Sequence, residues 1–142
     1  MRLPNMQYSP LQPAFTLRTI SVEIISGNLL GFLMKKDQKF VQVKVDFIGG
    51  PTDCHSFATN LELMDPLQTR FTGNKAFEVK ITCPETTFMH FVLSDEDGQL
   101  IGQKVMRLFN MNTGFRCLVL EDKNGKIPGA PSLFFKIKVS NL

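Results

Sequence analysis

Hydrophobic and polar residues alternate along several short segments of the chain. In TISVEII (residues 19–25) every second position is apolar, namely Ile20, Val22 and Ile24. The same period of two occurs in FVQVKVDF (40–47) and in AFEVKIT (76–82). A period of two is typical of a β-strand with one buried face. We therefore predict three half-buried strands in these segments.

Further segments extend this pattern over the rest of the chain. TFMHFVLS (87–94) is apolar on both faces, as a central strand would be. Additional strands are predicted in LIGQKVMRL (100–108), GFRCLVL (114–120), SLFFKIKV (132–139) and, from a less regular pattern, CHSFATNLEL (54–63). Turn residues such as Asp97-Gly98 and Asn124-Gly125 separate them, and no segment keeps a helical period over three turns. About eight short strands indicate an all-β antiparallel sandwich or barrel.

Composition fits one folded domain after a short tail. Residues 1–17 are rich in proline and lack periodicity, which predicts a linker or tail, and residues 18–142 are predicted to form the domain. Of the 142 residues, 43% are hydrophobic, enough for a substantial core. The net charge of +3 is too small to indicate a nucleic-acid partner.

Several functional classes find no support in the sequence. The three cysteines, Cys54, Cys83 and Cys117, are far apart in the sequence. Zinc binding is therefore not expected, and the cysteines are predicted to be free thiols. No signal-peptide core or membrane-spanning run is found, which predicts a soluble intracellular domain. His55 and His90 are the only histidines and no catalytic motif surrounds them, so the chain is not expected to be an enzyme.

Acidic residues offer a candidate metal site. Asp95 and Asp97 lie two apart in an extended segment, so they are expected to face the same way. Calcium requires six to eight oxygen ligands, which loops meeting at one end of a fold can supply. Asp37 and Asp65 are the candidates for additional ligands. The alternative is that Asp95 to Gly98 form a polar hairpin turn without a metal.

Basic and apolar residues suggest a second candidate site. Lys35, Lys36 and Lys39 follow the apolar stretch that contains Phe32 and Leu33. Lys44, Lys136 and Lys138 are predicted to face outward from strands, and would form one cationic face if the second and last strands share a sheet. Such residues fit an anionic lipid surface. Solubilising lysines and a loop packed under the sandwich are the alternative interpretation.

The order of these segments resembles the C2 domain of phosphoinositide-specific phospholipase C and its inactive relatives. The resemblance covers residues 19–139 and rests on ISVEIISGNLL, VQVKVDFIGGPTD, FEVKITCPETTFMHFVLSDEDGQLIGQ, NTGFRCLVLEDKNG and PSLFFKIKV. It implies an eight-stranded antiparallel Greek-key β-sandwich.

The resemblance also places Asp95 and Asp97 at the paired aspartates of calcium-dependent relatives. Other acidic positions of that family are not matched: Gln99 replaces the next loop acid, and Asp37 is displaced from the first-loop position. Asp65-Pro66 is not followed by the tryptophan of the family pattern. With so few carboxylates we expect a degenerate calcium site and weak or absent calcium binding.

Two functional hypotheses follow. The first is a non-catalytic module that packs on the catalytic barrel of a parent chain and assists peripheral association with an anionic phospholipid membrane. This hypothesis implies a monomeric domain, cytoplasmic and peripheral at the membrane, without nucleic acid and without a cofactor other than weakly bound calcium. The second is a protein-interaction sandwich with no role in lipid binding.

Overall fold

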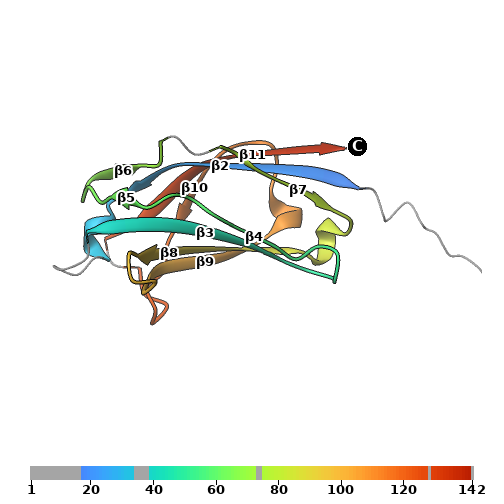
Figure 1. The fold of residues 1–142 in the computed structure, drawn as a ribbon. Helices are drawn as coiled ribbons and strands as arrows, with labels where there is room; N and C mark the ends of the chain where they lie inside the picture. The colour runs from blue at the N-terminus through green and yellow to red at the C-terminus, as the bar shows by residue number, and fades with distance from the viewer. Residues whose placement is uncertain (1–16, 34–38, 73–74, 128, 142) are drawn as a thin grey trace, which may run out of the picture.

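The computed structural model describes residues 17–33, 39–72, 75–127 and 129–141, and these form two antiparallel sheets packed face to face (Figure 1). The first sheet has the order β10 (Gly114–Val119), β11 (Ser132–Asn141) and β2 (Arg18–Asn28), with β6 (Gln68–Arg70) and β7 (Phe77–Ile81) both pairing with β2. The second sheet places β4 (His55–Ala58) and β5 (Glu62–Leu63) on β3 (Phe40–Ile48), followed by β8 (Phe88–Asp95) and β9 (Leu100–Arg107). The predicted all-β antiparallel sandwich is confirmed.

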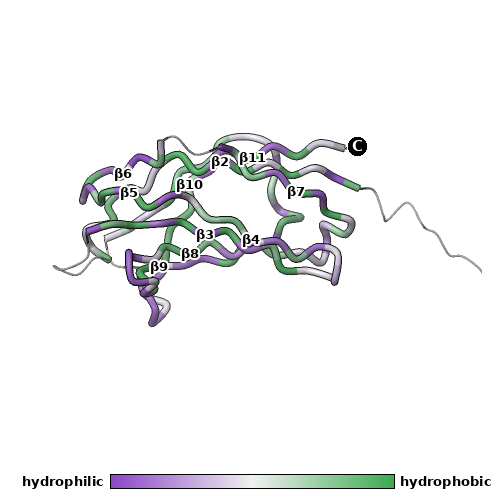
Figure 2. Tube along the Cα trace, in the orientation of Figure 1, coloured by the Kyte–Doolittle hydropathy of each residue, from purple (hydrophilic) through white to green (hydrophobic). Residues whose placement is uncertain are grey.

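The core lies between the sheets and is formed by alternate residues of the strands. Hydrophilic and hydrophobic positions alternate along most strands, as Figure 2 shows. Ile20, Val22 and Ile24 are buried on β2, as predicted. The rings of Phe91 on β8 and Phe135 on β11 meet between the two sheets, with their centroids 4.9 Å apart. This aromatic contact ties the sheets together at the centre of the sandwich.

The described residues contain more strands than the eight predicted. The segment 54–63 forms two strands, β4 and β5, because Thr59 interrupts it. The Thr59 hydroxyl accepts a hydrogen bond from the Val43 N–H at 3.0 Å, and its own N–H donates to the Val43 carbonyl oxygen at 2.8 Å. The three-residue strand β6 was not predicted. It pairs with Ser26 to Asn28 at the end of β2.

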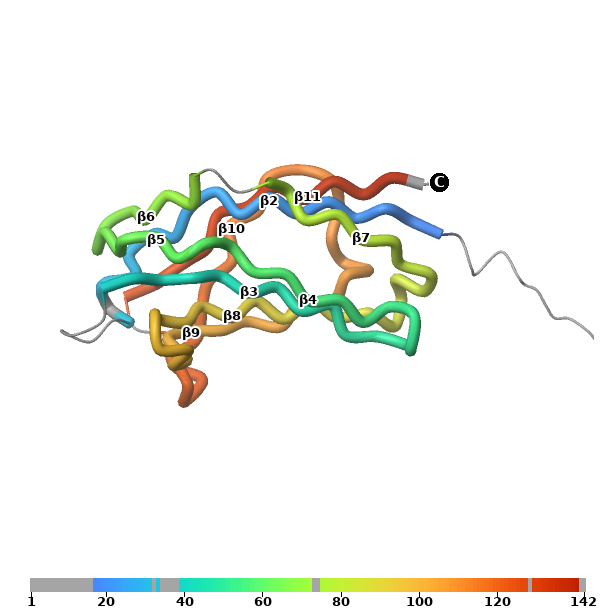
Figure 3. Tube along the Cα trace, in the orientation of Figure 1, coloured from blue at the N-terminus to red at the C-terminus, as the bar shows by residue number. Residues whose placement is uncertain are grey.

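The two ends of the sandwich carry different structural elements. At the terminus end, β2 begins and β11 finishes side by side, with Arg18 paired with Asn141 (Figure 3). The 3-10 helices η2 (Pro84–Thr86) and η3 (Leu108–Asn110) lie at this end. At the loop end lie η1 (Leu30–Phe32), the β5–β6 loop and the β8–β9 turn. No helix in the described ranges is long and apolar enough to cross a membrane.

A buried carboxylate fastens the β3–β4 connection to the segment after β7. Asp53 is 1% exposed, and its oxygens accept hydrogen bonds from the N–H groups of Thr82 (2.8 Å) and Cys83 (2.9 Å) and from the Thr82 hydroxyl. Burial by itself would raise the pKa of Asp53. These hydrogen bonds, together with the nearby His55, favour the charged form and lower the pKa below its ordinary value of 3.8.

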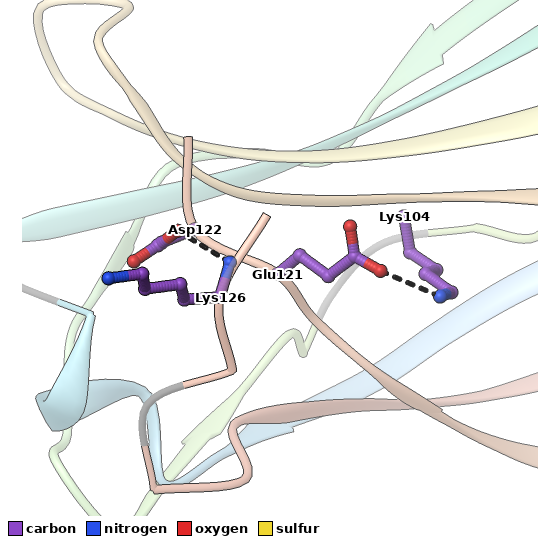
Figure 4. Close-up of polar contacts among 4 residues, drawn as sticks. All are labelled: Lys104, Glu121, Asp122 and Lys126. Carbon is purple, nitrogen blue, oxygen red and sulfur yellow. Dashed lines mark hydrogen bonds and ion pairs between the residues drawn. The ribbon is translucent and has the colours of Figure 1, made fainter. Parts of the chain in front are cut away.

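One edge of the sandwich is closed by a contact between the two sheets. Glu121, just after β10, exchanges both backbone hydrogen bonds with Gln103 on β9, at 2.8 and 2.9 Å. Beside this bridge the Lys104 ammonium lies 2.9 Å from a Glu121 carboxylate oxygen (Figure 4). The edge strand β10 of the first sheet is thereby joined, through the residue that follows it closely, to the edge strand β9 of the second sheet.

Candidate functional site at the loop end

The β8–β9 turn is organised by the carboxylate of Asp95. Asp95 is the last residue of β8 and is 4% exposed. Its Oδ1 accepts hydrogen bonds from the N–H groups of Asp97 at 2.9 Å and Gln99 at 2.8 Å. Gly98 completes the turn with φ of 79°, a conformation that glycine adopts without strain. Asp95 is therefore directed into the turn.

Asp97 differs from Asp95 in its environment, because it is exposed in the turn itself. The ligand atoms of the two carboxylates nevertheless lie within 4.8 Å of each other, so Asp95 and Asp97 remain candidates for one cation site. β8 ends at Asp95, so Asp97 belongs to the turn and not to the strand. The hydrogen bonds of Asp95 are those of a polar hairpin turn, the alternative considered from the sequence.

Glu96 is a member of this turn that the sequence analysis did not single out. Its carboxylate accepts hydrogen bonds from the N–H of Phe40 at 2.9 Å and of Lys39 at 3.3 Å, at the start of β3. Glu96 therefore attaches the acidic turn to the neighbouring strand. No local pattern could have indicated this contact, since the partners lie 56 and 57 residues away in the sequence.

Three carboxylates of the described residues lie close enough to share a cation. These are Asp95, Glu96 and Asp97, whose ligand atoms lie within 4.8 Å of one another. Asp65 is not part of this group. Its Oδ1 accepts hydrogen bonds from the N–H groups of Leu67 (3.0 Å) and Gln68 (3.4 Å) in the β5–β6 loop. Asp37, the fourth predicted ligand, lies outside the described residues.

A third aspartate at this end holds a turn in the same way. The Oδ1 of Asp122 accepts hydrogen bonds from the N–H groups of Asn124 and Lys126, each at 2.9 Å, and Figure 4 shows the Lys126 bond. Asp65, Asp95 and Asp122 thus all direct one carboxylate oxygen to backbone donors of their own loops. Their oxygens are therefore only partly available to a calcium ion, which takes six to eight oxygen ligands.

The predicted lysines are placed on three different surfaces. Lys39 is exposed at the loop end, just before β3. Lys44 is exposed on the outer face of the second sheet, 3.9 Å from Asp46. Lys136 and Lys138 are exposed on the outer face of the first sheet, because β11 belongs to that sheet. Lys35 and Lys36 lie outside the described residues.

The premise of one cationic face is therefore wrong. It requires the second and last strands to share a sheet, but β3 and β11 lie in different sheets of the sandwich. The outer faces of two packed sheets point in opposite directions, so Lys44 cannot act together with Lys136 and Lys138 on one flat surface. Strand order cannot be read from alternation, which explains the error.

The apolar loop after β2 is partly packed against the core. Leu30 is fully buried, and Leu33 is half-buried and contacts the core cluster. The side chain of Phe32 lies outside the described part of the chain. For Leu33 the contact agrees with the alternative of a loop packed under the sandwich.

Other apolar residues at the loop end are exposed, and the sequence analysis missed them. Leu67 is 73% exposed and Leu63 is 68% exposed. The Leu29 N–H donates to the Leu67 carbonyl oxygen at 2.9 Å, which joins the η1 loop to the β5–β6 loop. Between them lies an apolar groove of about 330 Å³ lined by Leu29, Gly31, Pro66 and Leu67. The turn signal Asp65-Pro66 between two leucines could have indicated an exposed apolar loop.

Comparison with solved structures identifies the class of fold. A C2 domain of plant Extended Synaptotagmin 1 is similar with a TM-score of 0.67 and 17% identity, over 91% of this chain and 97% of that chain. The crystal structure of S. officinalis PLC21 is similar with a TM-score of 0.77 and 26% identity, over 94% of this chain and 17% of that chain. The fold of the chain is that of a C2 domain.

Comparison with curated sequences gives particular relatives. The chain is 26% identical over 144 residues to 1-phosphatidylinositol 4,5-bisphosphate phosphodiesterase beta-4 of Bos taurus, covering 96% of this chain and 14% of that protein. It is 27% identical over 136 residues to Inactive phospholipase C-like protein 2 of Homo sapiens, covering 91% of this chain and 12% of that protein. No model of a known family matches the sequence.

These similarities confirm the resemblance to the C2 domains of phosphoinositide phospholipase C and its inactive relatives. The chain spans less than a fifth of the length of these relatives. The chain has the fold of a C2 domain, which is not itself catalytic, and it is similar to part of phospholipase C and phospholipase C-like proteins.

Proposed function

We propose that this C2 module helps to hold a phospholipase C-like parent protein at an anionic membrane surface, and that its loop end makes the contact. The parent would be cytoplasmic and peripheral at the membrane, and the module would pack on its catalytic barrel as a monomeric unit. The observation that supports the membrane contact is the group of exposed leucines at the loop end, Leu29, Leu63 and Leu67, with the exposed Lys39 nearby.

This combination suits the boundary between lipid headgroups and acyl chains. Apolar side chains gain free energy on entering the acyl region, in proportion to the apolar area removed from water. A lysine near an anionic surface contributes about 1 kcal/mol. Met64, between the leucines, donates its N–H to the Lys39 carbonyl oxygen at 2.8 Å, so the apolar loop and the lysine are held together.

Binding to vesicles tests the proposal. The variant carrying Leu63→Ser and Leu67→Ser is expected to bind phosphatidylserine-containing vesicles about tenfold more weakly, because it loses two apolar side chains from the contact. Co-sedimentation with vesicles of phosphatidylcholine, with and without phosphatidylserine, measures this. The matched control carries Ile48→Ser and Val105→Ser, two exposed residues of the second sheet away from the loop end. Equal binding by both variants would contradict the proposal.

The same assay measures how much each group of lysines contributes to vesicle binding. Lys39→Gln is expected to weaken binding about fivefold, the equivalent of about 1 kcal/mol, and high salt should remove this difference. Lys44→Gln and the double change of Lys136 and Lys138 to Gln remove charge from the two outer faces. An effect of Lys136 and Lys138 larger than that of Lys39 would move the membrane contact to the first sheet.

We further propose that calcium dependence is weak or absent. The supporting observation is that Asp95 and Glu96 already accept backbone hydrogen bonds. The double substitution Asp95→Asn and Asp97→Asn is therefore expected to change vesicle binding less than about twofold, with calcium or with chelator. Calorimetric titration is the direct measurement. Saturable micromolar calcium uptake that this double variant abolishes would disprove the proposal.

An alternative function, protein interaction without lipid binding, has one observation in its favour. On the outer face of the first sheet the rings of Phe115 and Phe134 stack with centroids 5.6 Å apart, and the Lys136 ammonium lies 5.6 Å from the Phe115 ring centroid. Exposed aromatic residues of this kind are common in protein interfaces. No binding to any vesicle, with or without calcium, would favour this alternative.

A further inference from the structure

The outer face of the first sheet carries an apolar stripe on its edge strand, β10. Phe115, Cys117 and Val119 alternate with inward residues and are all exposed, Phe115 by 59%. Phe134, on the neighbouring strand β11, extends the stripe by stacking on Phe115. Exposed aromatic residues are enriched in protein interfaces, so this stripe is a candidate contact surface.

The charged groups on the same face are mainly cationic. β10 and β11, the strands that carry the aromatic stack, contain no acidic residue. Both ion pairs found among the described residues lie elsewhere, one on Lys44 and one on Lys104. Four exposed cations therefore stand against two exposed acids on the first sheet, namely Lys80, Lys136, Lys138 and Arg70 against Glu23 and Glu78.

Lys136 is held in position by the aromatic stack. It lies opposite Glu23 in the sheet register, yet it is in no ion pair within the described ranges. Its ammonium instead lies over the Phe115 ring, where the negative face of the ring attracts it. An ammonium has three donors, so an anion can still bind it. A cation that is already ordered loses less conformational entropy when a carboxylate binds.

A groove beside the stack supplies a second cation. It has a volume of about 290 Å³, and its lining includes Phe134, Ser26 and Arg70. The sheet register places these three side chains in one row, because Phe134 pairs with Ser26 and Ser26 pairs with Arg70. The groove thus combines an aromatic wall with a guanidinium, the group that pairs best with a carboxylate.

The distribution of charge favours a polypeptide over a membrane as the partner for this face. Glu23 also lines the groove, and an anionic lipid surface would repel it. A polypeptide can instead place a donor opposite Glu23 and carboxylates opposite Lys136 and Arg70. The strands run between the two ends of the sandwich, so a membrane at the loop end would leave this face open (Figure 1).

We propose that the outer face of the first sheet binds an acidic segment of a partner protein. An apolar side chain of that segment packs on the Phe115–Phe134 stack, and its carboxylates pair with Lys136 and Arg70. This inference goes beyond the proposed function, because it does not depend on the loop end. It allows the module to bind a membrane and a protein at the same time.

The two exposed free cysteines allow a direct test. Cys117 lies in the stripe, paired with Phe134, whereas Cys54 lies in the β3–β4 connection of the other sheet. The probe is the synthetic peptide Glu-Phe-Glu-Glu-Phe-Glu, and mass spectrometry follows alkylation by iodoacetamide. At saturating peptide we expect Cys117 to be alkylated at least about tenfold more slowly and Cys54 at an unchanged rate. The same peptide with glutamine in place of glutamate should bind at least about fivefold more weakly.

Paired variants test the residues of the proposed contact. Phe115→Ser combined with Lys136→Gln is expected to weaken binding of the acidic peptide at least about tenfold, measured by calorimetric titration. Both residues are exposed, so the fold should remain intact. The matched control is Phe88→Ser with Lys44→Gln, the same two changes at exposed positions of the second sheet. This control should bind the peptide as the native chain does.

Three outcomes would overturn the inference. The first is an unchanged rate of Cys117 alkylation at peptide concentrations up to the millimolar range. The second is equal binding by the acidic and the glutamine peptides, which would mean that the cations do not select the partner. The third is slower Cys117 alkylation with phosphatidylserine vesicles but not with the peptide, which would assign this face to the membrane. The effect of Leu63→Ser and Leu67→Ser on vesicle binding tests the proposed function separately.

Discussion

Replacing Phe91 with alanine is expected to lower the free energy of unfolding by about 4 kcal/mol, because the change leaves a cavity at the centre of the sandwich. Phe91 is fully buried on β8 and its ring contacts Phe135 of the opposite sheet. The sheets cannot close this space without moving their strands. Urea denaturation followed by circular dichroism measures the effect.

The matched control for this change is Phe115→Ala. Phe115 also stacks on a phenylalanine, Phe134, but on the outer face of the first sheet, where water fills the space that the ring leaves. Removing the Phe115 ring is expected to lower the free energy of unfolding by less than about 1 kcal/mol. Similar decreases in the free energy of unfolding for Phe91→Ala and Phe115→Ala would show that the contact between the sheets does not stabilise the fold as much as expected.

Replacing Asp53 with alanine is expected to lower the free energy of unfolding by about 3 kcal/mol, because it leaves buried backbone donors without an acceptor. The N–H groups of Thr82 and Cys83 would lose their partner, and the link between the β3–β4 connection and the end of β7 would be broken. The control is Asp122→Ala, which removes a similar carboxylate from an exposed turn and should cost less than about 1 kcal/mol.

Asp53 also gives the stability a dependence on pH. Its pKa is lower in the folded chain than the ordinary 3.8, so near and below that value the unfolded chain binds more protons than the folded chain. The stability that the carboxylate supplies is complete above this range and is lost as the pH falls through the folded pKa. Unfolding curves between neutral pH and about pH 2 should therefore converge for the native chain and Asp53→Ala. Parallel curves would contradict this account.

Most of the fold could be predicted from the sequence because burial in a sandwich repeats every two residues. The alternation at Ile20, Val22 and Ile24 follows directly from one strand face lying on the core. Interruptions are harder to predict. Thr59 breaks its segment through hydrogen bonds to Val43, and β6 is too short to show a period.

The candidate site was only partly predictable, because it depends on contacts distant in sequence. The acidic turn itself is visible in the sequence, but the role of Asp95 in holding it depends on where β8 ends. The exposure of Leu63 and Leu67 depends on how the β5–β6 loop meets η1. Likewise, the sequence around Asp53 indicates only a turn, and its partners at 82 and 83 are visible only in the folded chain.

The bridge between Gln103 and Glu121 has a consequence for aggregation. Unpaired strand edges invite the addition of strands from other molecules. Along one side of this domain the bridge ties Gln103 of β9 to Glu121, just after β10, with the Lys104 ion pair beside it. On the other side the described edges are divided among β4, β5, β6 and β7, none longer than five residues. The described edges are therefore short or interrupted, which limits the template that they offer to a misfolded neighbour.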